Sequence, residues 1–114
     1  MIRHHLQSLL LVTTLLPVSA LAQYVGPGPA VETTAAATVR ATDDTQVQLE
    51  GKLERQLRPG VFEFRDETGT VEVEIDAKDF PPQPITADTR VRLLGEVDRD
   101  WNRVSVDVDR LQVL

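Results

Sequence analysis

The sequence predicts an all-β protein: one small, closed antiparallel barrel of five strands, with a short helix before them. Two observations support this prediction. Five segments between residues 46 and 113 alternate apolar and polar side chains with a period of two, which is typical of half-buried strands. A proline-rich stretch between the third and fourth segments can form neither a ladder strand nor a long helix. The chain of 114 residues has room for one such domain.

The N-terminal segment has the pattern of a secretory signal peptide. Arg3 precedes an apolar run, Leu6 to Leu16, and Ala20-Leu21-Ala22 supplies the small residues of a cleavage site. The apolar run is about half of the ~20 residues that a membrane span needs. We therefore expect residues 1–22 to be removed on export, leaving a mature chain without a membrane span.

The next two segments lead into the barrel. Residues 23–31 are rich in glycine and proline and are predicted to form a flexible leader to a domain of residues 32–114. Glu32 to Ala41 is alanine-rich, which favours a short helix with Glu32 at its positive end and with Ala35 or Ala36 and Val39 packed on the strands.

The first half of the barrel is expected to consist of three strands. The first is Gln46 to Leu53, in which Gly51 marks a bend or bulge that lets one strand serve two halves of the sheet. A turn over Arg55 to Gly60 leads to Val61–Arg65, with Phe62 and Phe64 inward. A tight turn at Asp66–Gly69, with positive φ at Gly69, leads to the third strand, Thr70–Asp76, whose Val71, Val73 and Ile75 point inward.

A connector and a hairpin are expected to complete the barrel. Ala77 to Ala87 contains three prolines and is predicted to hold at most one helical turn, with Phe80 against one end of the core. The strands Arg90–Val97 and Arg103–Val113 flank a polar turn of five residues, Asp98–Asn102. The inward phase slips after Val108, which indicates a bulge near Asp109-Arg110. Trp101 in the turn is either a cap on the barrel end or a ligand platform.

Among small antiparallel barrels, the five-stranded Greek-key OB barrel is the architecture we expect for this strand count and length. An SH3-like barrel and an open sheet covered by a helix are the alternatives.

The composition of the chain argues against most kinds of enzyme catalysis and against soft-metal binding. After cleavage the chain holds no His or Cys, which removes the commonest bases, thiol nucleophiles and soft metal ligands. Ser105 is expected on an outward strand position with no imidazole nearby. The remaining candidates are carboxylates, Glu72, Glu74 and Asp76 on one strand face and Asp107 with Asp109 on another, whose spacing a glycosidase could use. A solvated acidic face explains them better, and we predict no enzyme and no cofactor.

The net charge of the chain and the spacing of its acidic residues indicate which binding partners to expect. Loss of Arg3 leaves 11 basic residues against 18 acidic ones, a net charge of −7, and such a chain repels phosphate backbones. The outer face of the second and third strands has no aromatic stacking platform, so nucleic acid is not an expected partner. Asp98-x-Asp100-x-Asn102 resembles the start of a calcium loop, but Arg103 stands where that loop needs glycine, and no metal site is predicted.

Several segments together resemble a known family. They are Asp43-Asp44-x-x-Val47-x-Leu49-x-Gly51, Phe62-x-Phe64-x-Asp66-x-x-Gly69-Thr70-Val71-x-Val73-x-Ile75-Asp76, Gly95-Glu96-Val97-Asp98-Arg99-Asp100-Trp101 and Val106-Asp107-Val108. In this order they are similar to the bacterial OB-fold proteins of the YgiW/YdeI stress-tolerance type. The resemblance covers residues 43–114. It implies an OB fold, a periplasmic location and a role in tolerating peroxide, acid, metals or cationic peptides, and it implies no catalytic residues.

Three hypotheses about function follow. The first is a non-catalytic binding module whose acidic face and loop edge hold a cationic small molecule, peptide or envelope component. The second is a regulator that docks on an envelope protein or a cell-wall glycan through Trp101, Arg99 and Arg58. The third, a carboxylate-based hydrolase, is the weakest. The residues predicted to bind are Arg58, Glu72, Glu74, Asp76, Asp98, Arg99, Asp100, Trp101 and Asn102.

Overall fold

The computed structural model describes residues 25, 26 and 28–114. The predicted signal peptide, its cleavage site and the start of the predicted leader lie outside these residues. Within the part of the chain that is described, no helix is long and apolar enough to cross a membrane.

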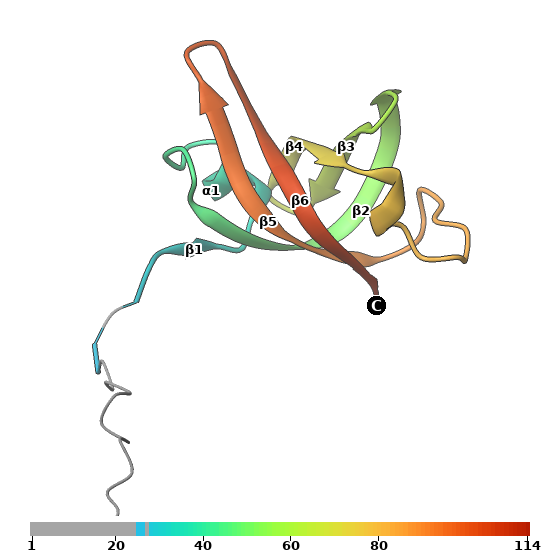
Figure 1. Ribbon diagram of the computed structural model, residues 1–114, viewed down its shortest axis with the longest axis horizontal. Helices are drawn as coiled ribbons and strands as arrows, with labels where there is room; N and C mark the ends of the chain where they lie inside the picture. The colour runs from blue at the N-terminus through green and yellow to red at the C-terminus, as the bar shows by residue number, and fades with distance from the viewer. Residues whose placement is uncertain (1–24, 27) are drawn as a thin grey trace, which may run out of the picture.

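Within residues 25, 26 and 28–114, six strands and two short helices make up the fold (Figure 1). In chain order they are β1 (Val31–Glu32), α1 (Ala35–Thr38), β2 (Gln46–Arg58), β3 (Val61–Asp66), β4 (Gly69–Ile75), the 3₁₀ helix η2 (Ala77–Asp79), β5 (Val91–Asp100) and β6 (Arg103–Val113). The sheet order is β1-β2-β3-β4-β6-β5, and a further pairing of β2 with β5 closes the barrel. The pairing of β4 with β6 is parallel, and the other barrel pairings are antiparallel. This closed five-stranded barrel is the predicted OB fold.

Strand β2 belongs to both halves of the barrel, as predicted. Its first half, Gln46–Gly51, pairs with β5, and its second half, from Lys52 to Arg58, pairs with β3. Gly51 stands at the change of partner, where a Cβ would lie 2.3 Å from the carbonyl oxygen of Arg65 and 2.7 Å from the Phe64 ring. Only glycine lets the two strands approach so closely.

The predicted turn over Arg55 to Gly60 is wrong, because β2 runs on to Arg58 and only Pro59-Gly60 turns. Two register shifts, between Leu53 and Arg55 and between Gln56 and Arg58, interrupt the pairing with β3. Bulges of this kind break the alternation of side chains, so this part of the strand does not show a period of two.

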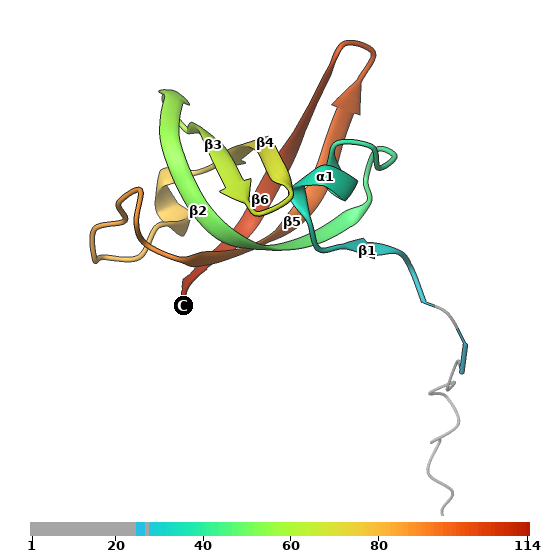
Figure 2. The same ribbon diagram turned by 180° about the vertical axis from the view of Figure 1, so that it is seen from behind.

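The β5–β6 hairpin is longer than predicted. The two strands pair as far as Asp100 and Arg103, so the turn is Trp101-Asn102 rather than five residues. Figures 1 and 2 show this hairpin extending well beyond the body of the barrel. Its tip covers no core, so its sequence lacks the apolar alternation that marks a buried strand. The predicted bulge is confirmed: Leu94 pairs with Arg110 and Gly95 with Val108, which leaves Asp109 as the extra residue.

The core lies inside the barrel and is aliphatic apart from Phe64. Its buried members are Ala35, Val47, Leu49, Leu53, Phe64, Val71, Val73, Ile75, Val91, Leu93, Val97, Val106, Val108 and Leu111. Phe62, predicted to be inward, is only half-buried and packs against Phe80, with ring centroids 5.5 Å apart. Phe80 is partly buried against the core, as expected for the connector.

The N-terminal helix is shorter than predicted. Glu32 lies in β1, which pairs with the start of β2, and α1 begins after the N-cap Thr34. Ala35 and Thr38 are buried, so Ala35 packs as expected. A helix of four residues is not stable alone. Asp66 and Thr68 of the β3–β4 turn hold its first turn by accepting the Ala35 and Ala36 amides at 2.9 Å and 3.0 Å.

Candidate ligand-binding site

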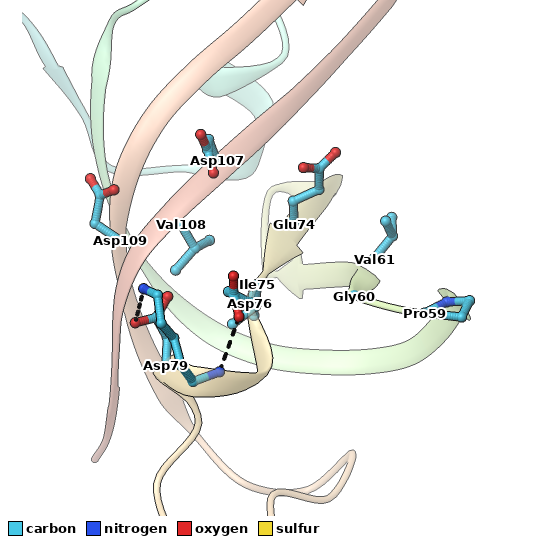
Figure 3. Close-up of a pocket in the computed structure, with 11 residues that line it drawn as sticks. Pro59, Gly60, Val61, Glu74, Ile75, Asp76, Asp79, Asp107, Val108 and Asp109 are labelled. Carbon is cyan, nitrogen blue, oxygen red and sulfur yellow. Dashed lines mark hydrogen bonds and ion pairs between the residues drawn. The ribbon is translucent and has the colours of Figure 1, made fainter.

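A cavity of about 480 Å³ opens on the outer face of the barrel beside the β2–β3 turn (Figure 3). Its walls come from that turn, the end of β4, η2 and the middle of β6. The lining residues are Pro59, Gly60, Val61, Glu74, Ile75, Asp76, Lys78, Asp79, Asp107, Val108 and Asp109. Five of them are carboxylates and one is a cation, so the cavity carries a strongly negative charge.

The topology brings two acidic strand faces together at this cavity. Glu74 of β4 and Asp107 of β6 are partners in the parallel ladder, and Figure 3 shows both side chains on the same side of the two strands. The sequence analysis placed them on separate faces, because nothing in the chain order shows that β4 pairs with β6. Like charges in neighbouring strand positions repel each other. A positive ligand between them would relieve that repulsion.

The remaining charges of the cavity are partly engaged. Asp76 accepts a hydrogen bond from the Lys78 backbone N–H at 3.2 Å and thereby caps η2. The Lys78 ammonium group contacts Asp79 at 3.4 Å. Asp107 and Asp109 are exposed on β6. Glu74, Asp107 and Asp109 are thus the carboxylates of the cavity for which no hydrogen bond or ion pair occurs within the described residues.

Glu72, predicted to bind a cationic ligand, instead joins three strands. Its Oε2 accepts hydrogen bonds from Arg58 of β2 at 3.1 Å and from Arg103 of β6 at 2.5 Å. Its side chain is 23% exposed, so two arginines already neutralise a half-buried carboxylate. Arg58, a predicted anchor, is held by the same contact. These residues form a structural cross-link beside the acidic cavity rather than part of it.

Three of the predicted residues near the hairpin tip have structural partners. The backbone N–H of Arg99 donates to Asp43 Oδ1 at 2.7 Å, and its guanidinium donates to the carbonyl oxygens of Ala41 and Val39 at 2.8 Å and 2.5 Å. Arg99 therefore fastens the hairpin to the segment after α1. Asp100 Oδ1 accepts the Asn102 N–H at 3.1 Å and shapes the turn.

Trp101 is 92% exposed at the tip of the hairpin. The reading of Trp101 as a cap on the barrel end is wrong, because the hairpin carries it away from the barrel body. Its indole is available to solvent and to a partner. Asp98 is also exposed and lines a second, smaller cavity together with Asp100 and Glu74.

The structure adds site residues that the sequence analysis did not select. Asp79, Asp107 and Asp109 line the large cavity with the predicted Glu74 and Asp76. The alternation along β6 does mark Asp107 as outward-facing. The sequence does not show that Glu74 is the neighbour of Asp107, because the parallel pairing of β6 with β4 depends on how the barrel closes.

The β3–β4 turn contains Asp66, a carboxylate whose pKa is lowered by its surroundings. Partial burial acts to raise the pKa of Asp66, but hydrogen bonds from the Thr68 hydroxyl and from the backbone of Ala35, Thr68 and Gly69 outweigh burial and lower the pKa below its usual value. Asp66 lies away from the acidic cavity and has a structural role. Its ionised form holds the start of α1 against the turn.

Together, these observations define the class of the protein: a closed Greek-key barrel of the OB-fold type whose outer face bears an acidic cavity. A family model described as bacterial OB fold (BOF) protein matches residues 16–113. The chain belongs to this family, which confirms the resemblance seen in the sequence.

The chain is similar to two relatives, one named for its regulation and one whose name states no role. The chain is 45% identical over 98 residues to the calcium-regulated OB-fold protein CarO of Pseudomonas aeruginosa, covering 85% of this chain and 84% of CarO. It is 37% identical over 70 residues to protein YgiW of Escherichia coli K12, covering 61% of this chain and 54% of YgiW. Neither name describes a reaction.

Solved structures agree with the fold. The structure of YgiW from E. coli matches with a TM-score of 0.70 and 32% identity, over 82% of this chain and 99% of that one. A replication protein A heterotrimer bound to single-stranded DNA matches with a TM-score of 0.55 and 18% identity, over 75% of this chain and 81% of that one. At that identity the second likeness concerns the fold alone.

Proposed function

We propose that this protein is a non-catalytic periplasmic binding protein that holds cationic ligands in the acidic cavity and thereby contributes to tolerance of envelope stress. The main observation behind the proposal is the pairing of Glu74 with Asp107 in the wall of a cavity of about 480 Å³. Adjacent carboxylates without a cationic partner destabilise a sheet. A bound cation offsets this cost and gains electrostatic energy in return.

The charge of the cavity selects the class of ligand. Lys78 is its one basic residue, and its ammonium group already contacts Asp79. A phosphate or carboxylate ligand would meet five carboxylates, whereas an ammonium or guanidinium group would find several acceptors. The same electrostatic argument keeps nucleic acid outside the proposal, although one protein of similar fold, the replication protein A heterotrimer, is bound to single-stranded DNA in its structure. Basic peptides and polyamines are the partners that fit this chemistry.

A nuclear magnetic resonance titration tests the proposal. The mature domain is titrated with a tetralysine peptide at about 0.15 M salt, where diffuse surface attraction is largely screened. The proposal predicts saturable shift changes at the backbone amides of Glu74, Asp107 and Asp109, with little change in the connector around Asp88. Shifts that spread evenly over the acidic residues, or that vanish at this salt concentration, would show that the cavity is not a site.

Calcium provides a second arm of the same experiment. CarO is named for regulation by calcium. The double charge of a divalent cation would attract it to the acidic face more strongly than sodium, although no group of three carboxylates with the geometry of a metal site occurs among the described residues. We therefore expect calcium chloride to displace the peptide more effectively than sodium chloride of equal ionic strength. Equal displacement by the two salts would mean that calcium acts on this face only by screening.

The stress role needs a test in cells. A strain lacking the gene is challenged with peroxide, acid, metals and cationic peptides, and is complemented with wild-type protein or with Asp107→Asn. The proposal predicts sensitivity that wild-type protein restores and Asp107→Asn restores only in part. Full rescue by Asp107→Asn would separate the stress role from the acidic cavity.

Exposure of Trp101 favours a second candidate, docking on an envelope protein or a cell-wall glycan. An indole that is 92% exposed on a projecting hairpin is an anchor of the kind that protein and sugar interfaces use. Arg99 and Arg58, the other proposed anchors, are held by contacts within the chain. Binding of the domain to purified peptidoglycan, compared with Trp101→Ala, tests this candidate, and unchanged binding would remove Trp101 from it.

A further inference from the structure

A second cavity, of about 100 Å³, lies along the outer half of the β5–β6 hairpin, close to its turn. It is lined by Glu74, Asp98, Asp100, Arg103 and Ser105. Asp98 is paired with Ser105 across the hairpin, and Asp100 with Arg103. Glu74 reaches it from β4 and also lines the larger cavity, so the two cavities share one wall.

Ser105 distinguishes this cavity from an ordinary acidic surface. Its position between the buried Val106 and the half-buried Val104 gives it an outward phase, as the sequence predicted, yet only 7% of its surface is exposed. Its hydroxyl makes no hydrogen bond within the residues that the structure describes. Buried hydroxyl groups in folded proteins nearly always have a partner. A hydroxyl held in a cavity wall without one is available to a ligand.

The charges around Ser105 favour a cation. Three carboxylates face one guanidinium, and that guanidinium is directed to Glu72, which is not part of the cavity wall. The carboxylates are not gathered as the ligands of a metal ion are, since no group of three such side chains with that geometry occurs among the described residues. A larger cation with directional N–H donors suits this spacing better.

The size of the cavity limits which cationic group of a ligand can enter it. The cavity has a volume of about 100 Å³, which is less than the roughly 150 Å³ of a protein cavity that holds benzene. That is enough for an ammonium group and the methylene next to it, and too little for a ring or a stretch of peptide. An ammonium group has three N–H donors, and the cavity offers the Ser105 hydroxyl oxygen and several carboxylate oxygens as acceptors.

We propose that this cavity seats one primary ammonium group of a cationic ligand, with the Ser105 Oγ and the Glu74 and Asp98 carboxylates as its acceptors. The inference rests on the proposed function, because the ligand's remaining positive charges occupy the larger cavity across Glu74. The ammonium group can come from a lysine side chain of a peptide or from a polyamine, and the experiment separates these sources.

The test compares three probes on wild-type protein and two variants. The probes are tetralysine, tetra-arginine and spermidine, at about 0.15 M salt. Ser105→Ala removes only the hydroxyl oxygen and suits a buried position. Asp109→Asn is the matched control, because Asp109 lines the larger cavity alone. Trp101, the single tryptophan of the chain, follows Asp100 in the turn and reports binding by its fluorescence.

The proposal predicts that wild-type protein prefers tetralysine to tetra-arginine, because the three N–H donors of a compact ammonium group suit the acceptors around Ser105 better than a wider, planar guanidinium does. Loss of one hydrogen bond to a charged group should weaken tetralysine binding to Ser105→Ala by about tenfold or more, with little change for tetra-arginine. Asp109→Asn should weaken both peptides alike. Spermidine binding that shows the same dependence on Ser105 would identify a polyamine as a ligand, and spermidine binding without it would leave the lysine side chain.

Two failures are distinguishable. If wild-type protein binds tetralysine and tetra-arginine equally and Ser105→Ala changes neither, this inference is wrong while the proposed function stands. If wild-type protein binds none of the probes, the proposed function is wrong as well. Equal unfolding midpoints for Ser105→Ala and wild type guard against a loss that merely reflects misfolding.

Discussion

Replacing Gly51 by alanine tests the packing on which the barrel depends. The new Cβ would lie 2.3 Å from the Arg65 carbonyl oxygen and 2.7 Å from the Phe64 ring, whereas ordinary contacts begin near 3.4 Å. The difference between 3.4 and 2.3 Å means that β3 must move about 1.1 Å away from β2. The obstacle is backbone, which cannot rotate aside as a side chain does. Overpacking of this kind costs about 1–3 kcal/mol.

Urea unfolding followed by far-ultraviolet circular dichroism measures this cost, since the exposed Trp101 is a poor reporter of the core. Gly28→Ala is the control, because a Cβ at Gly28 meets nothing within 4 Å. We expect Gly28→Ala to leave the free energy of unfolding unchanged and Gly51→Ala to lower it by at least about 1 kcal/mol. Equal free energies of unfolding for Gly51→Ala and wild type would refute the close approach of β2 and β3.

Three further substitutions address the contacts that hold the hairpins and α1. Asp66→Asn should lower the free energy of unfolding by about 1 kcal/mol near neutral pH through loss of at least one hydrogen bond, measured by urea unfolding. Arg99→Met should lower it by about 2 kcal/mol and speed hydrogen exchange at the hairpin tip, because its guanidinium donates to two carbonyl groups. Glu72→Gln should cost at most about 1 kcal/mol, since both arginines that pair with Glu72 are about half exposed to solvent.

The effect of Asp66→Asn should depend on pH in a definite direction. The pKa of Asp66 is lower in the folded protein, so its ionised form stabilises the fold above the ordinary aspartate pKa of about 3.9. This contribution is lost as the pH falls through the folded-state pKa. The difference in unfolding free energy between wild type and Asp66→Asn should therefore shrink on acidification. A difference that stays constant or grows would contradict the role of the ionised carboxylate.

The predictions for Arg99→Met and Glu72→Gln have their own controls. Arg55 pairs with Glu63 on the surface and is 65% exposed at its side chain, so Arg55→Met should cost much less than Arg99→Met. Equal losses would mean that Arg99 does not fasten the hairpin. For Glu72→Gln, a loss well above about 2 kcal/mol would show that the cross-link to Arg58 and Arg103 contributes more than an ordinary surface ion pair.

Much of the fold was predictable because the alternation of side chains responds to burial on one face. Val71, Val73 and Ile75 on β4 are buried as their spacing predicts, and the phase slip on β6 marks the bulge at Asp109. Predictions failed where burial does not control the pattern. The second half of β2 is interrupted by bulges, and the tip of the β5–β6 hairpin has no core beneath it.

The site was less predictable, because it depends on which strands become neighbours. Glu74 and Asp107 lie 33 residues apart in the chain, and only the parallel pairing of β4 with β6 places them side by side. Ser105 has the outward phase of an exposed residue, but it is buried among the side chains that line the small cavity. The sequence shows no partner for Arg99 or Arg58. In the fold, Arg99 donates hydrogen bonds to two backbone carbonyl groups and Arg58 donates one to Glu72.

The most direct test of the central claim is the affinity of the mature domain for tetralysine in wild type, Asp107→Asn and Asp88→Asn, measured by calorimetry at about 0.15 M salt. Both substitutions remove one negative charge, but only Asp107 lines the acidic cavity. We predict saturable binding that Asp107→Asn weakens by about threefold to tenfold and Asp88→Asn leaves unchanged. Equal weakening by the two variants, or no saturable binding to wild-type protein, would contradict a cation-binding site at the pairing of β4 with β6.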